Sequence, residues 1–133
     1  MPANREPGPD KVLIKVVATG LNPKDWKWTR YRGQDQAMNA GNDITGIFES
    51  VGSRMFEYKS GDRVAAFHLM AGSRGAYAEY AIASFSIKFH LPPNVSFEAE
   101  AGLPLSFMTA AIALYQALQL LLPTVAGEKR TSR

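Results

Sequence analysis

Apolar and β-branched residues gather in short runs along most of the chain, a pattern typical of strands. The clearest run is Lys11 to Thr19 (KVLIKVVAT), which is apolar on both faces and predicts an inner strand. Four later runs also predict strands: Ile44–Val51, Arg63–Phe67, Ala76–Ala83 and Ser86–His90. The pattern therefore favours a compact β-rich domain.

Glycine and proline mark the connections between these runs. Gly20 ends the first strand, and Asn22-Pro23 opens a turn into a predicted helix from Lys24 to Tyr31. Gly46 lies inside a strand, where it indicates close approach of a neighbouring backbone. Turns or loops are predicted at Gly61-Asp62, over Arg32–Asn42 and over Gly72–Gly75.

The periodicity becomes helical after Pro93. Ser96 is the expected N-cap of a short helix with Glu98 and Glu100 in its first turn. Pro104 interrupts the pattern before a longer helix expected from Ser106 to Leu121. Its apolar residues recur every three or four positions, at Phe107, Ala111, Leu114, Leu118 and Leu121.

The boundaries of these elements give the domain organisation. We expect a domain over residues 1–104, an exit helix over 105–122 and, after Pro123, a polar tail over 123–133. The fold class is then mainly β with C-terminal helices.

A long uncharged stretch raises the question of a membrane. No charged residue occurs from Ala101 to Gly127, which is long enough to span a bilayer. Polar residues such as Gln116 and Gln119, together with two prolines, favour a helix buried against protein. We therefore expect no membrane association.

Composition narrows the classes of partner and chemistry. The 133 residues suit one domain, and the net charge of +3 lies largely in the last ten residues, so no nucleic-acid surface is expected. The absence of cysteine excludes disulfides and cysteine-based metal sites, and the two histidines lie far apart, so no metal is expected. The segment from Met1 to Asp10 does not resemble a signal peptide, so we expect a cytoplasmic protein.

Single residues by themselves assign no reaction. The chain contains no phosphate-binding glycine loop and no nucleophile elbow. Asp43 and Asp62 lie in turn-like contexts with nothing to pair them, and His68 and His90 are expected at strand ends.

Three further side chains each leave two interpretations open. Lys27 fits either a solvated helix lysine or a cationic anchor. Two tyrosines of the alternating run, Tyr77 and Tyr80, fit core and rim positions better than stacking platforms.

Five motifs in order carry a family resemblance over Val12 to Leu122. They read VLIKVVATGLNPKDWK, GNDITGIFESVG, GDRVAAF, GAYAEY and LPPNVSFEAEAGLPLSFMTAAIALY. This order closely resembles the first, GroES-like half of the medium-chain dehydrogenase/reductase superfamily. The resemblance implies a GroES-like, partly open β-barrel.

The motif Asn22-Pro23-Lys24-Asp25-Trp26-Lys27 refines the resemblance. It is similar to the trans-acting enoyl reductases that partner fungal polyketide synthases. Quinone reductases share the Asn-Pro-x-Asp core but tend to lack the Trp-Lys that follows. The implied activity is NADPH-dependent reduction of the C=C bond of an α,β-unsaturated polyketide thioester.

Two departures from zinc-dependent alcohol dehydrogenases place the resemblance in the zinc-independent branch. Those enzymes have a ligand cysteine where this chain reads Gly20-Leu21-Asn22, and Gly-His-Glu where it reads Gly41-Asn42-Asp43. Without the thiolate and the imidazole, a catalytic zinc ion cannot be held there.

The resemblance also implies site residues. The cofactor would contact Asn22, Lys24, Asp25, Trp26, Lys27 and Thr109, with Lys27 the residue expected to act in catalysis. Taken alone, Thr109 in an apolar helix is expected to bond back to a preceding carbonyl. The substrate channel would be lined by Ala110, Ala111, Ile112, Ala113, Leu114, Tyr115, Gln116 and Ala117. The alanines in this stretch fit plain helix propensity equally well.

Length is the largest departure from the family. Its members continue into a Rossmann domain that binds most of the cofactor, whereas the ending TVAGEKRTSR does not resemble a Rossmann strand. We therefore expect a truncated reductase, inactive alone, whose exit helix exposes an apolar face suited to self-association or a partner chain. Two alternatives stay open: a catalytically silent GroES-like module or remnant, and a quinone oxidoreductase-like enzyme. The expected partners are a small-molecule or acyl-carrier-bound enoyl substrate and a polyketide synthase.

Overall fold

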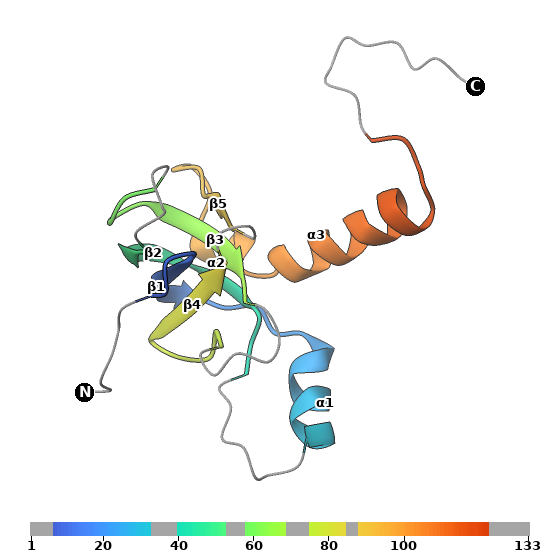
Figure 1. Cartoon of the computed structure of the whole chain (residues 1–133), viewed down its shortest axis with the longest axis horizontal. Helices are drawn as coiled ribbons and strands as arrows, with labels where there is room; N and C mark the ends of the chain where they lie inside the picture. The colour runs from blue at the N-terminus through green and yellow to red at the C-terminus, as the bar shows by residue number, and fades with distance from the viewer. Residues whose placement is uncertain (1–6, 33–39, 53–57, 69–74, 85–87, 123–133) are drawn as a thin grey trace.

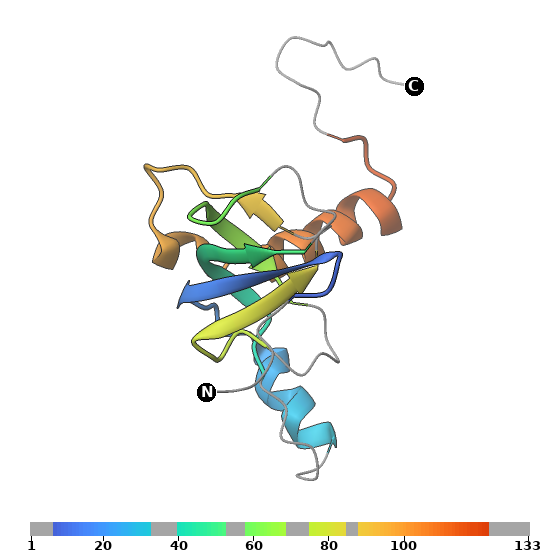
Figure 2. The ribbon, with the colours of Figure 1, turned by 60° about the vertical axis from the view of Figure 1, so that its left-hand side comes forward.

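The computed structural model describes residues 7–32, 40–52, 58–68, 75–84 and 88–122 of the chain. Its centre is a five-stranded antiparallel sheet in the order β4-β1-β2-β3-β5. The strands are β1 (Lys11–Ala18), β2 (Asp43–Val51), β3 (Arg63–Phe67), β4 (Tyr80–Ser84) and β5 (Lys88–His90). The sheet curves without closing (Figure 2), which confirms the predicted mainly-β, partly open fold.

The strand β1 lies inside the sheet, between β2 and β4, as its apolar composition predicts. Ile14 of β1 is opposite Phe48 of β2, and both side chains are fully buried. Gly46 confirms the predicted close approach, because a Cβ there would lie 2.1 Å from the backbone oxygen of Lys15. Register shifts interrupt the pairing of these two strands on both sides of Ile14–Val16. The core forms around this pair and consists of Val12, Ile14, Ile44, Phe48, Val64, Ala66, Ala76, Ala81 and Ala83.

The predicted strand Ala76–Ala83 was partly wrong. Its first half, residues 76–79, bends, although the Glu79 carbonyl still accepts from the Val16 amide of β1 at 2.9 Å, and β4 begins at Tyr80. The reason is tertiary: the backbone amides of Ala76 and Tyr77 donate to the carbonyl oxygens of Gly41 and Ala40. The Gly61-Asp62 turn is confirmed, with Gly61 at a φ of 95°. The predicted loop residues 33–39 and 72–74, and the strand residues 86–87, lie outside the described residues.

The first two helices follow their sequence signals. α1 (Pro23–Arg32) begins at Pro23, and α2 (Phe97–Glu100) is capped by Ser96, whose Oγ accepts from the Ala99 amide at 3.1 Å.

The long C-terminal helix differs from its prediction at both ends. It begins at Pro104, which serves as the first residue of α3 (Pro104–Ala111), and then widens into the π-helix η2 (Ile112–Ala117). It ends at Ala117, before Pro123, with Leu118 as its C-cap, because Gln119 turns into the left-handed region with a φ of 52°. The polar tail 123–133 lies outside the described residues.

Both α1 and α3 project from the sheet instead of lying flat on it (Figures 1 and 2). The apolar face of the exit helix is exposed: Phe107 is 68% and Leu118 is 65% accessible. The expectation of an exposed apolar face is therefore confirmed. The helix leaves this face open because other side chains, most of them from the sheet, fill the core.

One stretch, Phe97–Ala117, has the length and composition to cross a membrane, with a mean hydropathy of 1.2 and 11% of it buried. Glu98 and Glu100 lie within it, and a turn at 101–103 separates α2 from α3. A single stretch of this kind is weak evidence for a membrane span.

Candidate functional site

The side chain of Asp43, the first residue of β2, is fully buried at the point where three segments of the chain meet. Its Oδ2 accepts from Asn22 Nδ2 at 2.8 Å, and its Oδ1 accepts from the Leu105 amide at 2.6 Å. The Thr19 hydroxyl donates to the Asp43 backbone oxygen at 2.7 Å. This one residue therefore connects β2 with the turn before α1 and with the first turn of α3.

The start of α1 is held by a second carboxylate. Asp25 Oδ2 accepts from the backbone amide of Asn22 at 3.0 Å, and so closes the first turn of the helix as in a capping box. The same oxygen accepts from the Tyr77 hydroxyl at 2.7 Å, and Asp25 is buried. Asn22 and Asp25, both predicted to bind cofactor, thus use polar atoms to fix the turn that carries the rest of the motif.

The remaining residues of the motif present two cations and an indole ring. Trp26 is 59% exposed and Lys27 is exposed, with its Nζ 5.6 Å from the centre of the Trp26 ring. Lys24 is half-buried, and its Nζ lies 5.3 Å from the centre of the Phe67 ring at the end of β3. The exposed part of this helix is therefore positively charged and partly aromatic.

Burial governs the protonation of this network. Desolvation raises the pKa of Asp43, although the hydrogen bonds from Asn22 and Leu105 act in the opposite direction. Desolvation lowers the pKa of Lys24, against the attraction of Asp25 and Asp43. Burial and the neighbouring Asp25 carboxylate raise the pKa of Tyr77, so its hydroxyl stays protonated and donates.

The second predicted segment lies on the projecting helix. Thr109 is exposed, and its hydroxyl donates to the Leu105 carbonyl at 2.8 Å, which confirms the expected bond to the preceding turn. Ala110 and Ala111 end α3, and residues 112–117 form η2. Of residues 110–117, only Ala111 and Tyr115 are half-buried and the rest are exposed. Asp43 joins this helix to the Asn22–Lys27 motif through its bond to Leu105.

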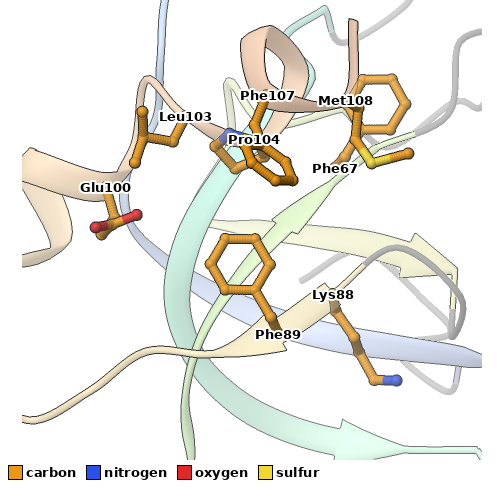
Figure 3. A pocket seen from close by; sticks show the side chains of 8 residues that line it. All are labelled: Phe67, Lys88, Phe89, Glu100, Leu103, Pro104, Phe107 and Met108. Carbon is orange, nitrogen blue, oxygen red and sulfur yellow. The ribbon is translucent and has the colours of Figure 1, made fainter. Parts of the chain in front are cut away.

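An apolar pocket lies beside the first turns of α3 (Figure 3). Its volume is about 480 Å³, and its lining residues are Phe67, Lys88, Phe89, Glu100, Leu103, Pro104, Phe107 and Met108. Phe89 points toward Phe107 across the pocket, and the charged Lys88 and Glu100 lie on opposite sides of it. Because Phe67 also contacts Lys24, the pocket adjoins the motif on α1.

The position that holds a zinc ligand in zinc-dependent alcohol dehydrogenases has a structural role here. Asn42 is buried, and its Nδ2 donates to the backbone oxygen of His68. His68 follows β3 directly, with its Nδ1 donating to the Ile82 carbonyl at 2.6 Å, and His90 ends β5, so both histidines lie at strand ends as predicted. No group of three or more metal-binding side chains occurs among the described residues.

Sequence reasoning missed two residues of this network, Asp43 and Tyr77. A signal for Asp43 was present, since an aspartate directly before the apolar strand Ile44–Val51 is placed where burial is expected. Tyr77 gave no such signal, because its partner Asp25 is 52 positions away in the chain.

Comparison with known proteins places this arrangement. Residues 8–93 match the family described as the alcohol dehydrogenase GroES-like domain. The trans-enoyl reductase fsr4 of Gibberella fujikuroi is 41% identical over 116 residues, which are 87% of this chain and 34% of that protein. The quinone oxidoreductase of Rattus norvegicus is 36% identical over 112 residues, 82% of this chain and 33% of that protein. The chain thus spans about a third of the length of these relatives.

Solved structures agree with this placement. The quinone oxidoreductase from Coxiella burnetii has a TM-score of 0.73 at 30% identity, over 84% of this chain and 37% of that one. A mycobacterial protein complexed with NADPH has a TM-score of 0.73 at 28% identity, over 90% of this chain and 37% of that one.

Proposed function

Because the chain belongs to the alcohol dehydrogenase GroES-like domain family, within the medium-chain dehydrogenase/reductase superfamily, we propose that it serves an NADPH-dependent enoyl reductase. The substrate is the C=C bond of an α,β-unsaturated polyketide thioester. The observation that carries this proposal is the 41% identity to a trans-enoyl reductase, a match that spans 87% of this chain.

The side chains on α1 fit a dinucleotide phosphate. Such a ligand carries several negative charges and aromatic rings, and the exposed surface of α1 offers the cations Lys24 and Lys27 beside the indole of Trp26. Asn22 and Asp25 would contribute indirectly, by holding these three residues in place.

NADPH would supply the hydride that the β-carbon of the substrate receives. The carbonyl oxygen of the thioester gains negative charge at that moment, and the α-carbon then takes a proton. The ammonium of Lys27 would stabilise the oxygen or a cofactor phosphate, because a fixed cation is most effective where charge develops. Thr109 would contact the nicotinamide end of the cofactor, and the segment from Ala110 to Ala117 would line the acyl end of the site.

The setting of this reaction follows from the same proposal. The substrate is carried on an acyl carrier, the partner is a polyketide synthase, and both are cytoplasmic. Zinc takes no part, because the ligand cysteine is absent and Asn42, which stands in place of the ligand histidine, donates to the backbone oxygen of His68.

Two other functions have their own support. The identity to rat quinone oxidoreductase favours a quinone substrate. The exposed apolar side chains of the exit helix fit a silent GroES-like module that binds a partner without turnover. Assays of a full-length homologue with an enoyl thioester and, separately, with a quinone distinguish the enoyl reductase from the quinone oxidoreductase.

Calorimetric titration of NADPH into the 133-residue chain tests whether this part binds the cofactor itself. Saturable binding at micromolar NADPH supports the reductase and contradicts the silent module. An absence of heat at millimolar NADPH contradicts cofactor binding by this chain and supports the module.

A further inference from the structure

We propose that Asp43 is the positioning residue that fixes the Asn22–Lys27 motif of α1 relative to helix α3, and thereby sets the distance across the cofactor site. The proposal rests on the proposed function for its link to NADPH. The positioning itself depends only on the contacts of Asp43 with these two elements.

The contacts divide the carboxylate between the two elements. Oδ2 accepts from Asn22 and Oδ1 accepts from the Leu105 amide, at 2.8 and 2.6 Å. Leu105 is the second residue of α3, where backbone amides lack partners within the helix. One rigid, fully buried side chain therefore holds two helices that otherwise project from the sheet.

The surrounding packing leaves the carboxylate little room to move. A Cβ added to Gly20 would lie 2.3 Å from the Ala101 oxygen and 3.0 Å from Asp43 Oδ2. The segment before α1 and the segment before α3 therefore touch at this residue. A buried acceptor in such a place is costly to leave without a donor.

An exchange of side chains provides the sharpest variants. Asn22→Asp places two carboxylates side by side, and Asn22→Ala removes the α1 bond while Leu105 stays bonded. The double variant Asn22→Asp/Asp43→Asn restores one donor and one acceptor in the same space, so it should recover what Asn22→Asp loses. Asp43→Asn alone is the matched control, because the Asn22 amide can turn its oxygen toward the new NH₂ while the remaining oxygen still accepts from Leu105.

The distance between the helices can be measured directly, because the chain contains no cysteine. Nitroxide labels at Arg30→Cys on α1 and Gln116→Cys on η2, both exposed, report that distance by double electron–electron resonance. We expect one narrow distribution in the parent, in Asp43→Asn and in the double variant, and a shifted or broadened one in Asn22→Asp and Asn22→Ala. Loss of stability alone would not change the distribution of the folded molecules.

The unlabelled variants are then titrated with NADPH, where we expect Asn22→Asp and Asn22→Ala to raise Kd about tenfold and the exchange to recover most of the affinity lost in Asn22→Asp. Unchanged distributions in Asn22→Asp and Asn22→Ala overturn the proposal, whatever the titration gives. If these two variants change the distribution but the parent binds no NADPH, the result supports the positioning and contradicts the proposed function instead. If Asn22→Asp does not fold, Asn22→Ala gives the same reading.

Discussion

Two lysines three positions apart on α1 lie in different surroundings. Lys27 is exposed beside Trp26, whereas Lys24 is half-buried above Phe67 and near two carboxylates. The first is free to reach a ligand, and the second depends on its protein environment for its charge. The two residues therefore call for different tests.

For Lys27, we expect Lys27→Ser in a full-length homologue to lower turnover about a hundredfold, since it removes a cation that stabilises developing negative charge. The free energy of unfolding should change by less than about 0.5 kcal/mol, because the side chain is exposed. Steady-state kinetics and urea unfolding measure the two quantities. Lys59→Ser, at another exposed lysine, is the matched control, and unchanged turnover would remove Lys27 from the site.

For Lys24, the lowered pKa predicts a pH effect on binding. The ammonium loses its proton below the ordinary lysine value of 10.5, so NADPH affinity should fall as the pH rises toward that value. Lys24→Arg should keep its affinity over this range, because the guanidinium stays charged. Fluorescence titrations of both proteins between neutral and alkaline pH provide the measurement.

The effect of Lys24 on stability has the opposite sign. In this alkaline window the unfolded chain binds more protons than the folded one, so the contribution of Lys24 to the free energy of unfolding rises with pH. The raised pKa of Tyr77 acts in the opposite direction over the same range, so the contribution of Lys24 is taken as the difference in free energy of unfolding between the parent and Lys24→Arg. A difference that falls as the pH rises would contradict the assignment.

At the scale of elements, the pair β1–β2 forms the centre of the core. It contains the largest core side chains, Phe48 and Ile14, and β2 begins at Asp43. The close approach at Gly46 lets these strands pair where a side chain would collide with the backbone. A disturbance of this pair should therefore reach the site through Asp43.

We expect Gly46→Ala to lower the free energy of unfolding by about 3 kcal/mol, since its Cβ would lie 2.1 Å from a backbone oxygen that cannot rotate away. Gly102→Ala is the control: nothing lies within 4 Å of its Cβ, and its effect should stay within about 0.5 kcal/mol. Urea denaturation followed by circular dichroism measures both. Equal effects would show that the strands move apart easily.

At the scale of the whole molecule, the exit helix has an apolar surface that the described part of the chain does not cover. Phe107, Leu114 and Leu118 are exposed on a helix that projects from the domain, and surfaces of this kind mark contacts with another surface. The chain spans about a third of its relatives, so a further part of a reductase, a partner or a second copy would each fit this description.

Self-association through this helix predicts that Phe107→Gln/Leu118→Gln lowers the sedimentation coefficient at high protein concentration, because it removes apolar area from the contact. The thermal midpoint should be unchanged, since both side chains are exposed. Leu21→Gln, an exposed leucine in the turn before α1, is the control. Concentration-dependent sedimentation that persists in the double variant would place the contact elsewhere.

The sequence alone determined the local elements and the family. Strand β1, helix α1 with Pro23 at its start, the Ser96 cap and the close approach at Gly46 all follow from neighbouring residues. Such features depend on backbone sterics and on side chains a few positions apart, which a sequence displays directly. The ordered motifs likewise identified the GroES-like family.

Only the tertiary structure decided how the site is held together. Asp43 bonds to Asn22 and Leu105, which are 21 and 62 positions away, and Tyr77 reaches Asp25 over 52 positions. The bend at residues 76–79 is likewise set by distant partners, because the amides of Ala76 and Tyr77 donate to the carbonyls of Gly41 and Ala40. A buried hydrogen bond forms where folding brings a donor to an acceptor and excludes water, and residue order does not encode that distance.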